Sequence, residues 1–210
     1  MKLNLGCGPV QPDGWTNVDH SYRARLATRL PVINRALVRT RLLPETEFKP
    51  GLVAVNLEKA LPWADGTVEA IYGGEMLEHF TERDGTRLLG ECVRVLRPGG
   101  VLRMRVPDNA AFWGNYLEEY RAMLARPRAE WTDGHARWTR MFFDDICVRP
   151  RIGFFGHFHK WMFDEISLCI AFERAGLTQV SRRAFHDSRI ADVAGVEVRD
   201  DLIVEGVKPS

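Results

Sequence analysis

Short apolar runs alternate with amphipathic segments along this chain, and the two patterns predict different elements. Apolar runs bounded by turn residues are typical of buried strands, and here they lie at residues 2–5, 15–19, 52–55, 68–72, 101–106, 177–185 and 201–207. Helical spacing of apolar residues predicts helices at 81–97 and 163–175. An alternation of strands and helices predicts an α/β layered domain.

The helix at 81–97 has the clearest boundaries. Leu88, Leu89 and Cys92 recur on one face, with Val93 and Leu96 beside them. Thr81 is suited to cap the first turn, and the Pro-Gly-Gly sequence at 98–100 ends the helix.

Two segments interrupt the alternation. Residues 20–49 hold six arginines and one lysine against two glutamates, and Leu26, Leu30, Ile33 and Leu37 are helically spaced. We therefore expect a basic helical insertion at 20–50, broken or restarted at Pro31. It is interpreted either as a solvated insertion packed on the domain, or as a lid or a surface for an anionic or lipid-bearing acceptor.

The second insertion, at 107–160, is rich in aromatic residues and arginine and has no strand pattern. Aromatic faces with polar neighbours suit sugar rings, and they also suit hydrophobic cores. The segment is interpreted as the acceptor side of the molecule.

Composition narrows the class of protein. The 210 residues fit a single domain spanning 1–210, and 45% apolar and 27% charged residues are ordinary for a globular protein. A net charge of +1 gives no overall nucleic-acid footprint, so no nucleic-acid partner is expected. Four widely spaced cysteines without a Cys-x-x-Cys pair, and no long apolar run, predict a cytoplasmic protein without disulfides.

The first strand ends in Gly6-Cys7-Gly8, and this turn suggests a ligand site. Glycine lets the backbone turn sharply and approach a ligand, and nucleotide-like ligands bind beyond the carboxyl ends of parallel strands. Asp19 ends the second strand, where one carboxylate can accept from both hydroxyls of a ribose. Gln11 stands where a dinucleotide fingerprint would place its third glycine, which disfavours a dehydrogenase.

Taken together with residues 56–65, 75–80 and 94–107, the Leu-Asn-Leu-Gly-Cys-Gly sequence and Asp19 resemble the class I S-adenosylmethionine-dependent methyltransferases. The resemblance implies a Rossmann-like sheet, mostly parallel with the last strand antiparallel, and helical insertions after strands 2 and 5. It also implies S-adenosylmethionine as cofactor. The expected cofactor-binding residues are Leu5, Gly6, Cys7, Gly8, Asp19, Asn56, Leu57 and Gly74. Since only ten residues separate Gly8 from Asp19, we expect a shortened first crossover instead of a full helix.

A candidate metal site follows the fourth expected strand. On a helical turn, Glu75, Glu78 and His79 would project from one face. The run is similar to the Glu-x-x-Glu-His motif of metal-dependent O-methyltransferases, which implies a further histidine from a distant segment, and His159 is our choice. Magnesium or manganese is the expected ion. The alternative is that these residues serve packing and local hydrogen bonds.

His157, His159 and Asp108 are the candidate catalytic residues. An alcohol is a poor nucleophile at neutral pH and needs a general base or a divalent cation. His157 and His159 lie two apart, so on an extended chain they point the same way. Asp108 follows the fifth strand and is expected to orient a base, bind a sugar hydroxyl or cap the next helix.

The overall layout resembles small methyltransferases of bacterial glycan pathways, including enzymes that methylate mannose-type oligosaccharides. The resemblance implies methyl transfer to a hydroxyl of a sugar or oligosaccharide, in polysaccharide biosynthesis. The alternatives are a metal-free methyltransferase for a small phenol, quinone or lipid with a histidine base, and a cofactor-binding but silent partner subunit. Peripheral contact with a membrane or a lipid-linked acceptor, and a homodimer, are further expectations.

Overall fold

A six-stranded sheet forms the centre of the computed structural model, which describes residues 1–43, 48–49, 51–143 and 158–210. Its strands are β1 (Lys2–Leu5), β2 (Thr16–Val18), β3 (Val68–Gly74), β4 (Leu96–Val106), β5 (Thr178–Arg182) and β6 (Leu202–Val207). They lie in the order β2-β1-β3-β4-β6-β5. The first four pair in parallel, and β6 runs antiparallel to both β4 and β5. This confirms the predicted mixed sheet with an antiparallel final strand.

The strand predicted at 52–55 is wrong. Only Val53 pairs, as a single parallel bridge to Val18 beside β2. Its amide donates to the carbonyl of Asn17, and its own carbonyl accepts from the amide of Asp19. Because β2 is only three residues long, it offers a partner strand little backbone to pair with.

The boundary between the first long helix and β4 also differs from the prediction. The helix ends at Val95 and β4 begins at Leu96, which pairs with Val68 at the start of β3. Pro98 cannot continue a helix, and the chain enters the sheet before it instead of after the two glycines.

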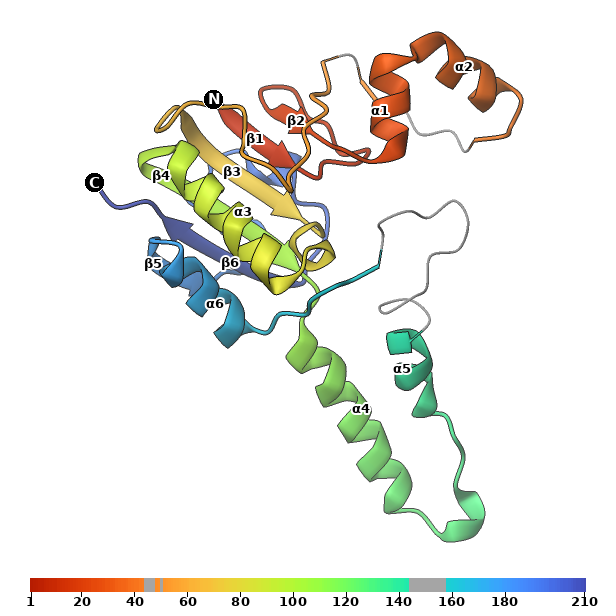
Figure 1. Ribbon diagram of the computed structural model, residues 1–210. Helices are drawn as coiled ribbons and strands as arrows, with labels where there is room; N and C mark the ends of the chain where they lie inside the picture. The colour runs from red at the N-terminus through yellow and green to blue at the C-terminus, as the bar shows by residue number, and fades with distance from the viewer. Residues whose placement is uncertain (44–47, 50, 144–157) are drawn as a thin grey trace.

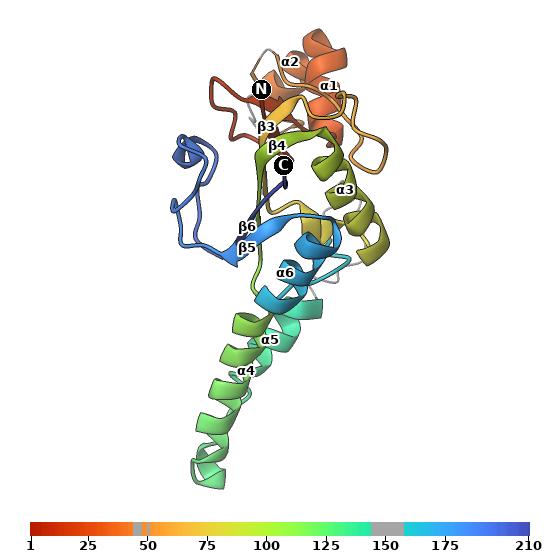
Figure 2. The same ribbon diagram turned by 90° about the vertical axis from the view of Figure 1, so that its left-hand side faces the viewer.

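One face of the sheet is covered by helices α3 (Glu82–Val95) and α6 (Glu165–Arg174), as Figures 1 and 2 show. Thr81 caps α3 by accepting from the amide of Asp84, as predicted, and Asp164 caps α6. The two helices and this face of the sheet bury the main core. Its fully buried members include Leu3, Leu5, Ile71, Leu88, Cys92, Leu102, Leu168 and Phe172.

The opposite face is covered by the connection between β5 and β6, which includes the short helix η4 (Val193–Gly195) (Figure 2). Trp15 and Tyr72 pack there against Ile190 and Val193. No helix lies between β1 and β2, where residues 6–15 form turns and loop, so the expected shortened crossover is confirmed.

A buried ion-pair network lies within this second face. The guanidinium of Arg103 donates to both carboxylate oxygens of Glu197, at 2.9 and 2.8 Å, and to Glu205 at 3.2 Å. The same guanidinium donates to the carbonyls of Ala184 and Asp187. These contacts satisfy its donors inside the protein, so the charges fix the β5–β6 connection to the sheet.

Both predicted insertions are helical where the structure describes them. The first holds α1 (Tyr22–Arg29) and α2 (Pro31–Arg39), with the second helix starting at Pro31 as expected. The second holds α4 (Asn109–Leu124), η2 (Arg128–Glu130) and α5 (Ala136–Met141), which project from the sheet as an arm (Figures 1 and 2). Among the described residues, no helix combines the length and apolar character needed to cross a membrane.

Candidate functional site

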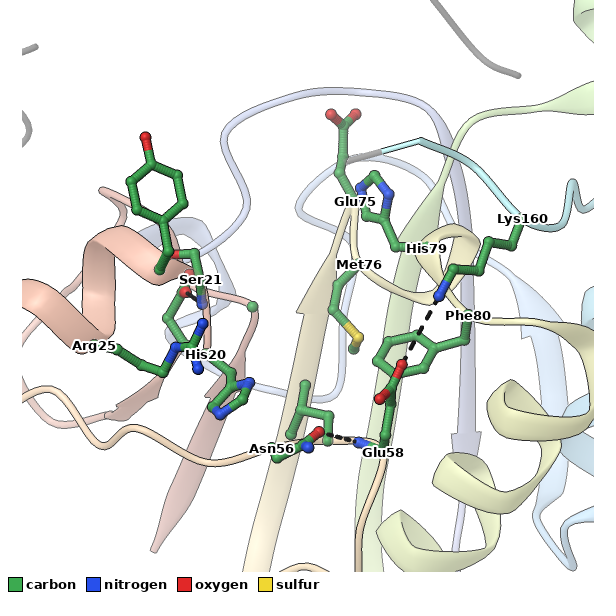
Figure 3. Close-up of a pocket in the computed structure, with 14 residues that line it drawn as sticks. His20, Ser21, Arg25, Asn56, Glu58, Glu75, Met76, His79, Phe80 and Lys160 are labelled. Carbon is green, nitrogen blue, oxygen red and sulfur yellow. Dashed lines mark hydrogen bonds and ion pairs between the residues drawn. The ribbon is translucent and has the colours of Figure 1, made fainter. Parts of the chain in front are cut away.

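A cleft of about 370 Å³ opens beyond the carboxyl ends of β1, β2 and β3 (Figure 3). This volume lies in the range of small-molecule sites. Five segments that are separate in the sequence supply its walls. The residues that line it are Gly6, Asp19, His20, Ser21, Tyr22, Arg25, Asn56, Leu57, Glu58, Glu75, Met76, His79, Phe80 and Lys160.

Gly6 is the one residue of the Gly6-Cys7-Gly8 turn, beyond β1, that lines the cleft. Gly6 and Gly8 both have positive φ, at 65° and 50°. A Cβ on Gly6 would come within 2.6 Å of the side chain of Met76, so the position also lacks room for a side chain. The amide of Cys7 donates to the carbonyl of Val18 at 3.0 Å, which fixes the turn to β2.

Asp19 lies at the end of β2, where the sequence placed it. Its two carboxylate oxygens accept from the backbone amides of Gly8 at 3.0 Å and Ser21 at 2.6 Å. The side chain is thereby held in one orientation at the wall of the cleft. Because each carboxylate oxygen can accept two hydrogen bonds, both retain capacity for a ligand hydroxyl.

The other predicted cofactor residues lie around this corner, but not all reach the cleft. Asn56 and Leu57 line it, and the side-chain oxygen of Asn56 accepts from the amide of Glu58 (Figure 3). Leu5 is fully buried in the core behind the turn. Burial also raises the pKa of the Cys7 thiol to about 12, which makes this residue part of the support and unsuited to be a nucleophile.

Gly74, the last predicted cofactor residue, ends β3 and is not among the residues lining the cleft. A Cβ there would come within 2.7 Å of the hydroxyl of Tyr72. The glycine thus allows the Tyr72 ring to pack beside the end of the strand.

The expected single face of Glu75, Glu78 and His79 does not form. The helical turn η1 covers only Leu77–His79, and Glu75 precedes it with a positive φ of 50°. The Glu75 carboxylate pairs with Arg105 at 2.8 Å and lies 3.6 Å from Arg199. In Figure 3 it points away from Met76 and Asn56. Glu75 therefore pairs with two arginines from other parts of the chain and is not a member of the metal-type group, although its charge still acts on Glu78 and His159.

Glu78, His79 and His159 do come together. One ligand atom from each lies within 4.8 Å of the other two, in the part of the chain that the structure describes. The carbonyl of Glu78 accepts from the amides of Lys160 and Trp161, at 2.8 and 3.2 Å. These two bonds bring the segment that carries His159 against η1, across 80 residues of sequence.

The environment of this group suits a cation. Glu78 is buried, and neither of its carboxylate oxygens has a hydrogen-bond partner among the described residues. Burial raises the pKa of Glu78 to about 8 and lowers the pKa of His159 below its ordinary value. The Nδ1 of His79 lies 3.2 Å from the carbonyl of Phe158, which can only accept, so Nδ1 carries the proton and Nε2 the lone pair.

One carboxylate and two imidazoles therefore fit a divalent ion. Two imidazoles shift the preference from magnesium toward manganese, iron or zinc. An ion would also compensate the buried carboxylate of Glu78, which the surrounding protein does not.

The remaining catalytic candidates lie elsewhere. His157 is outside the described residues, so its assignment stays a prediction. Asp108 caps α4 by accepting from the amides of Ala110 and Ala111, and it lies 3.4 Å from Arg182. Of the three functions expected for Asp108, its contacts support capping.

Sequence reasoning missed several cleft residues. His20, Tyr22 and Arg25 enter the cleft because α1 begins directly after β2, and Ser21 caps that helix. Burial and the neighbouring arginines lower the pKa of His20. On the other side, Lys160 lies 3.8 Å from Glu58, next to Phe80 in Figure 3. The sequence offered one signal for these cleft residues, because His20 and Arg25 follow directly after the end of a predicted strand.

The sequence of this chain is similar to that of known proteins. Residues 3–104 match a family model described as a methyltransferase domain. A probable S-adenosylmethionine-dependent methyltransferase of Mycolicibacterium smegmatis is 34% identical over 77 residues, covering 37% of this chain and 27% of that protein. An uncharacterized 37.1 kDa protein from transposon TN4556 of Streptomyces fradiae is 32% identical over 129 residues, covering 56% of this chain and 32% of that protein. The chain thus spans about a third or less of the curated relatives that it matches.

The fold of this chain is also similar to that of solved structures. The crystal structure of a methyltransferase from Archaeoglobus fulgidus that depends on S-adenosylmethionine aligns with a TM-score of 0.53 at 13% identity. The alignment covers 99% of this chain and 85% of the other. This likeness shows a shared fold, and the match to the methyltransferase domain model covers 102 of the 210 residues.

Proposed function

We propose that this chain, whose residues 3–104 match the methyltransferase domain family, transfers a methyl group from S-adenosylmethionine to a hydroxyl of a sugar or oligosaccharide, assisted by a divalent metal. The observation that carries the proposal is Asp19, an oriented carboxylate at the wall of a cleft beyond β1 and β2. Gly6 and His79 also line this cleft, and His79 belongs to the group of metal-type ligands with Glu78 and His159, which are not among the lining residues.

In this function the first wall of the cleft holds the cofactor. Asp19 accepts hydrogen bonds from the ribose hydroxyls, and the bare backbone at Gly6 lets the rest of the cofactor approach the end of β1. Asn56 retains its side-chain NH₂ for the adenine, because its oxygen is occupied by the amide of Glu58. Leu57 supplies apolar contact on the same side.

The second wall activates the acceptor. Glu78, His79 and His159 would hold the divalent ion, which when bound lowers the pKa of an acceptor hydroxyl. The hydroxyl proton leaves to water, an oxygen–methyl bond forms and the sulfur–methyl bond breaks. The Nδ1 hydrogen bond of His79 fixes its ring during this step.

The arm supports a sugar acceptor. Tyr120 and Trp131 are about 40% exposed, and the guanidinium of Arg128 lies 4.5 Å from the ring centre of Trp131. Exposed aromatic faces beside polar groups suit the apolar faces and hydroxyls of sugar rings. A buried aromatic cluster would not offer such faces.

A test of this function uses labelled S-adenosylmethionine with a panel of acceptors, including mannose-type oligosaccharides, a small phenol and a quinone. We expect label in the oligosaccharide, loss of transfer after chelation, and recovery when manganese is restored. His159→Gln should abolish the recovery, while His186→Gln, on the exposed β5–β6 connection, should retain it. Cofactor affinity should be nearly the same in the wild type, with and without the chelator, and in both variants, since the cofactor contacts lie at Asp19.

One observation favours a second candidate. The raised pKa of Glu78 and the lowered pKa of His159 describe a neutral acid beside a neutral imidazole, which is a competent general base without an ion. This matches a metal-free enzyme for a phenol, quinone or lipid acceptor. Full transfer to the phenol in the presence of the chelator would establish it and remove the metal.

A further inference from the structure

The charged side chains of the hairpin formed by α1 and α2, residues 21–43, are all positive. It contains six arginines and no acidic residue. One of them, Arg23, is buried against the domain. The other five are exposed, and none of these five forms an ion pair within the described part of the chain; they are Arg25, Arg29, Arg35, Arg39 and Arg41.

The same hairpin exposes aliphatic side chains. Val32 is 78% exposed, and Leu30 and Ile33 are about half exposed. Helix α2 has no buried residue at all. On a helix, Arg35 lies one turn from Val32 and Arg39 two turns from it, so arginines border the apolar strip.

The hairpin also borders the cleft. Ser21, Tyr22 and Arg25 are among the residues that line it. In Figure 1, α1 stands next to β2 and α2 lies farther from the sheet. A surface bound by the hairpin would therefore lie on the side of the cleft that α1 forms.

We propose that the α1–α2 hairpin docks this protein on the surface of an anionic lipid bilayer. Exposed arginines attract the negative headgroups, and aliphatic residues between them enter the boundary between headgroups and acyl chains. Charge complementarity alone would also fit a nucleic acid. The bilayer is favoured because Leu30, Val32 and Ile33 gain nothing from a phosphate backbone, and α2 has no aromatic ring to stack on bases.

The proposal does not depend on methyl transfer, because docking is measured without cofactor or acceptor. If both hold, the cleft lies where a lipid-linked acceptor would be presented. A docked enzyme that transfers no methyl group would contradict the proposed function alone.

The experiment measures sedimentation with vesicles of phosphatidylglycerol and phosphatidylcholine, against vesicles of phosphatidylcholine only. We expect binding to the first at low salt, release at high salt, and no binding to the second. Since each arginine near such a surface contributes about fivefold, Arg29→Gln/Arg35→Gln/Arg39→Gln should weaken binding roughly a hundredfold. A control of equal charge change, Arg83→Gln/Arg121→Gln/Arg126→Gln, removes exposed arginines elsewhere and should retain nearly all the binding.

A second variant distinguishes binding to a bilayer from binding to other polyanions. Val32→Ser/Ile33→Ser keeps every charge, and it should weaken vesicle binding while leaving any binding to duplex DNA unchanged. Circular dichroism should show the same helix content in all variants, because the substituted side chains are exposed. Equal loss in the hairpin and control triples, no binding at low salt, or vesicle binding unaffected by Val32→Ser/Ile33→Ser would each overturn the proposal.

Discussion

Replacing Glu78 by glutamine should stabilise the metal-free protein at neutral pH, although the substitution removes a buried ionisable side chain. Burial raises the pKa of Glu78 from 4.5 to about 8, so the folded protein keeps a proton that the unfolded chain releases. At pH 7 this proton lowers the free energy of unfolding by about 3 kcal/mol, because each pH unit above the unfolded pKa contributes about 1.36 kcal/mol.

The sign follows from the direction of this shift. Below the unfolded pKa both states are protonated and Glu78 contributes no penalty. Stability is lost progressively as the pH rises from about 4.5 toward 8. Glutamine resembles the protonated acid in shape and does not titrate, so Glu78→Gln should match the wild type near pH 4 and exceed it by about 3 kcal/mol at pH 7.

Urea unfolding at pH 4, 5, 6 and 7, in the presence of a chelator, measures this difference. Adding manganese at pH 7 should then stabilise the wild type and leave Glu78→Gln nearly unchanged, because an ion that binds only the folded state adds to its stability. A variant that is destabilised equally at every pH would refute the reasoning, since that result means a lost contact and not a buried proton.

Two further substitutions test the support of the cleft. Gly6→Ala should cost about 1–3 kcal/mol of stability, because alanine is strained at a φ of 65° and its Cβ meets Met76. Thermal unfolding should show the loss, and the same substitution should cost less when it is made in a Met76→Ala background, where only the backbone strain remains. Asp108→Ala should cost about 1 kcal/mol of stability by removing the cap of α4. An unchanged rate of methyl transfer would confirm that Asp108 only caps, whereas a lost rate with unchanged cofactor affinity would return it to the acceptor site.

The parts of the fold that depend on local chemistry were predictable. Gly6, Gly8 and Asp19 follow directly from the ends of short apolar strands, and Thr81 and Pro31 are local helix signals. The antiparallel final strand came from the resemblance to the methyltransferases and is confirmed.

What the sequence could not indicate depends on contacts between distant segments. Glu75 pairs with Arg105 and Arg199, which lie 30 and more residues later, instead of joining Glu78 in the metal-type group. Arg103 looks like an outward residue on an apolar strand, yet it is fully buried because Glu197 reaches it from the β5–β6 connection. The spacing of apolar and polar residues along the chain does not indicate either of these ion pairs.

The predicted strand at 52–55 failed for a related reason. Its composition suits a strand, but pairing needs a partner of sufficient length, and β2 supplies only three residues. Local propensity is a weak guide where the neighbouring strand sets how much backbone can pair.

The most direct test of the account is calorimetric titration of the demethylated cofactor product, S-adenosylhomocysteine, into the wild type, Asp19→Ala and Asp13→Ala. Asp13 has a fully exposed side chain and serves as the matched control. We expect binding to the wild type and the control, and a loss of about 1–3 kcal/mol, roughly ten- to a hundredfold, in Asp19→Ala. Equal affinity in all three, or no binding to the wild type, would contradict the assignment of this cleft to the cofactor.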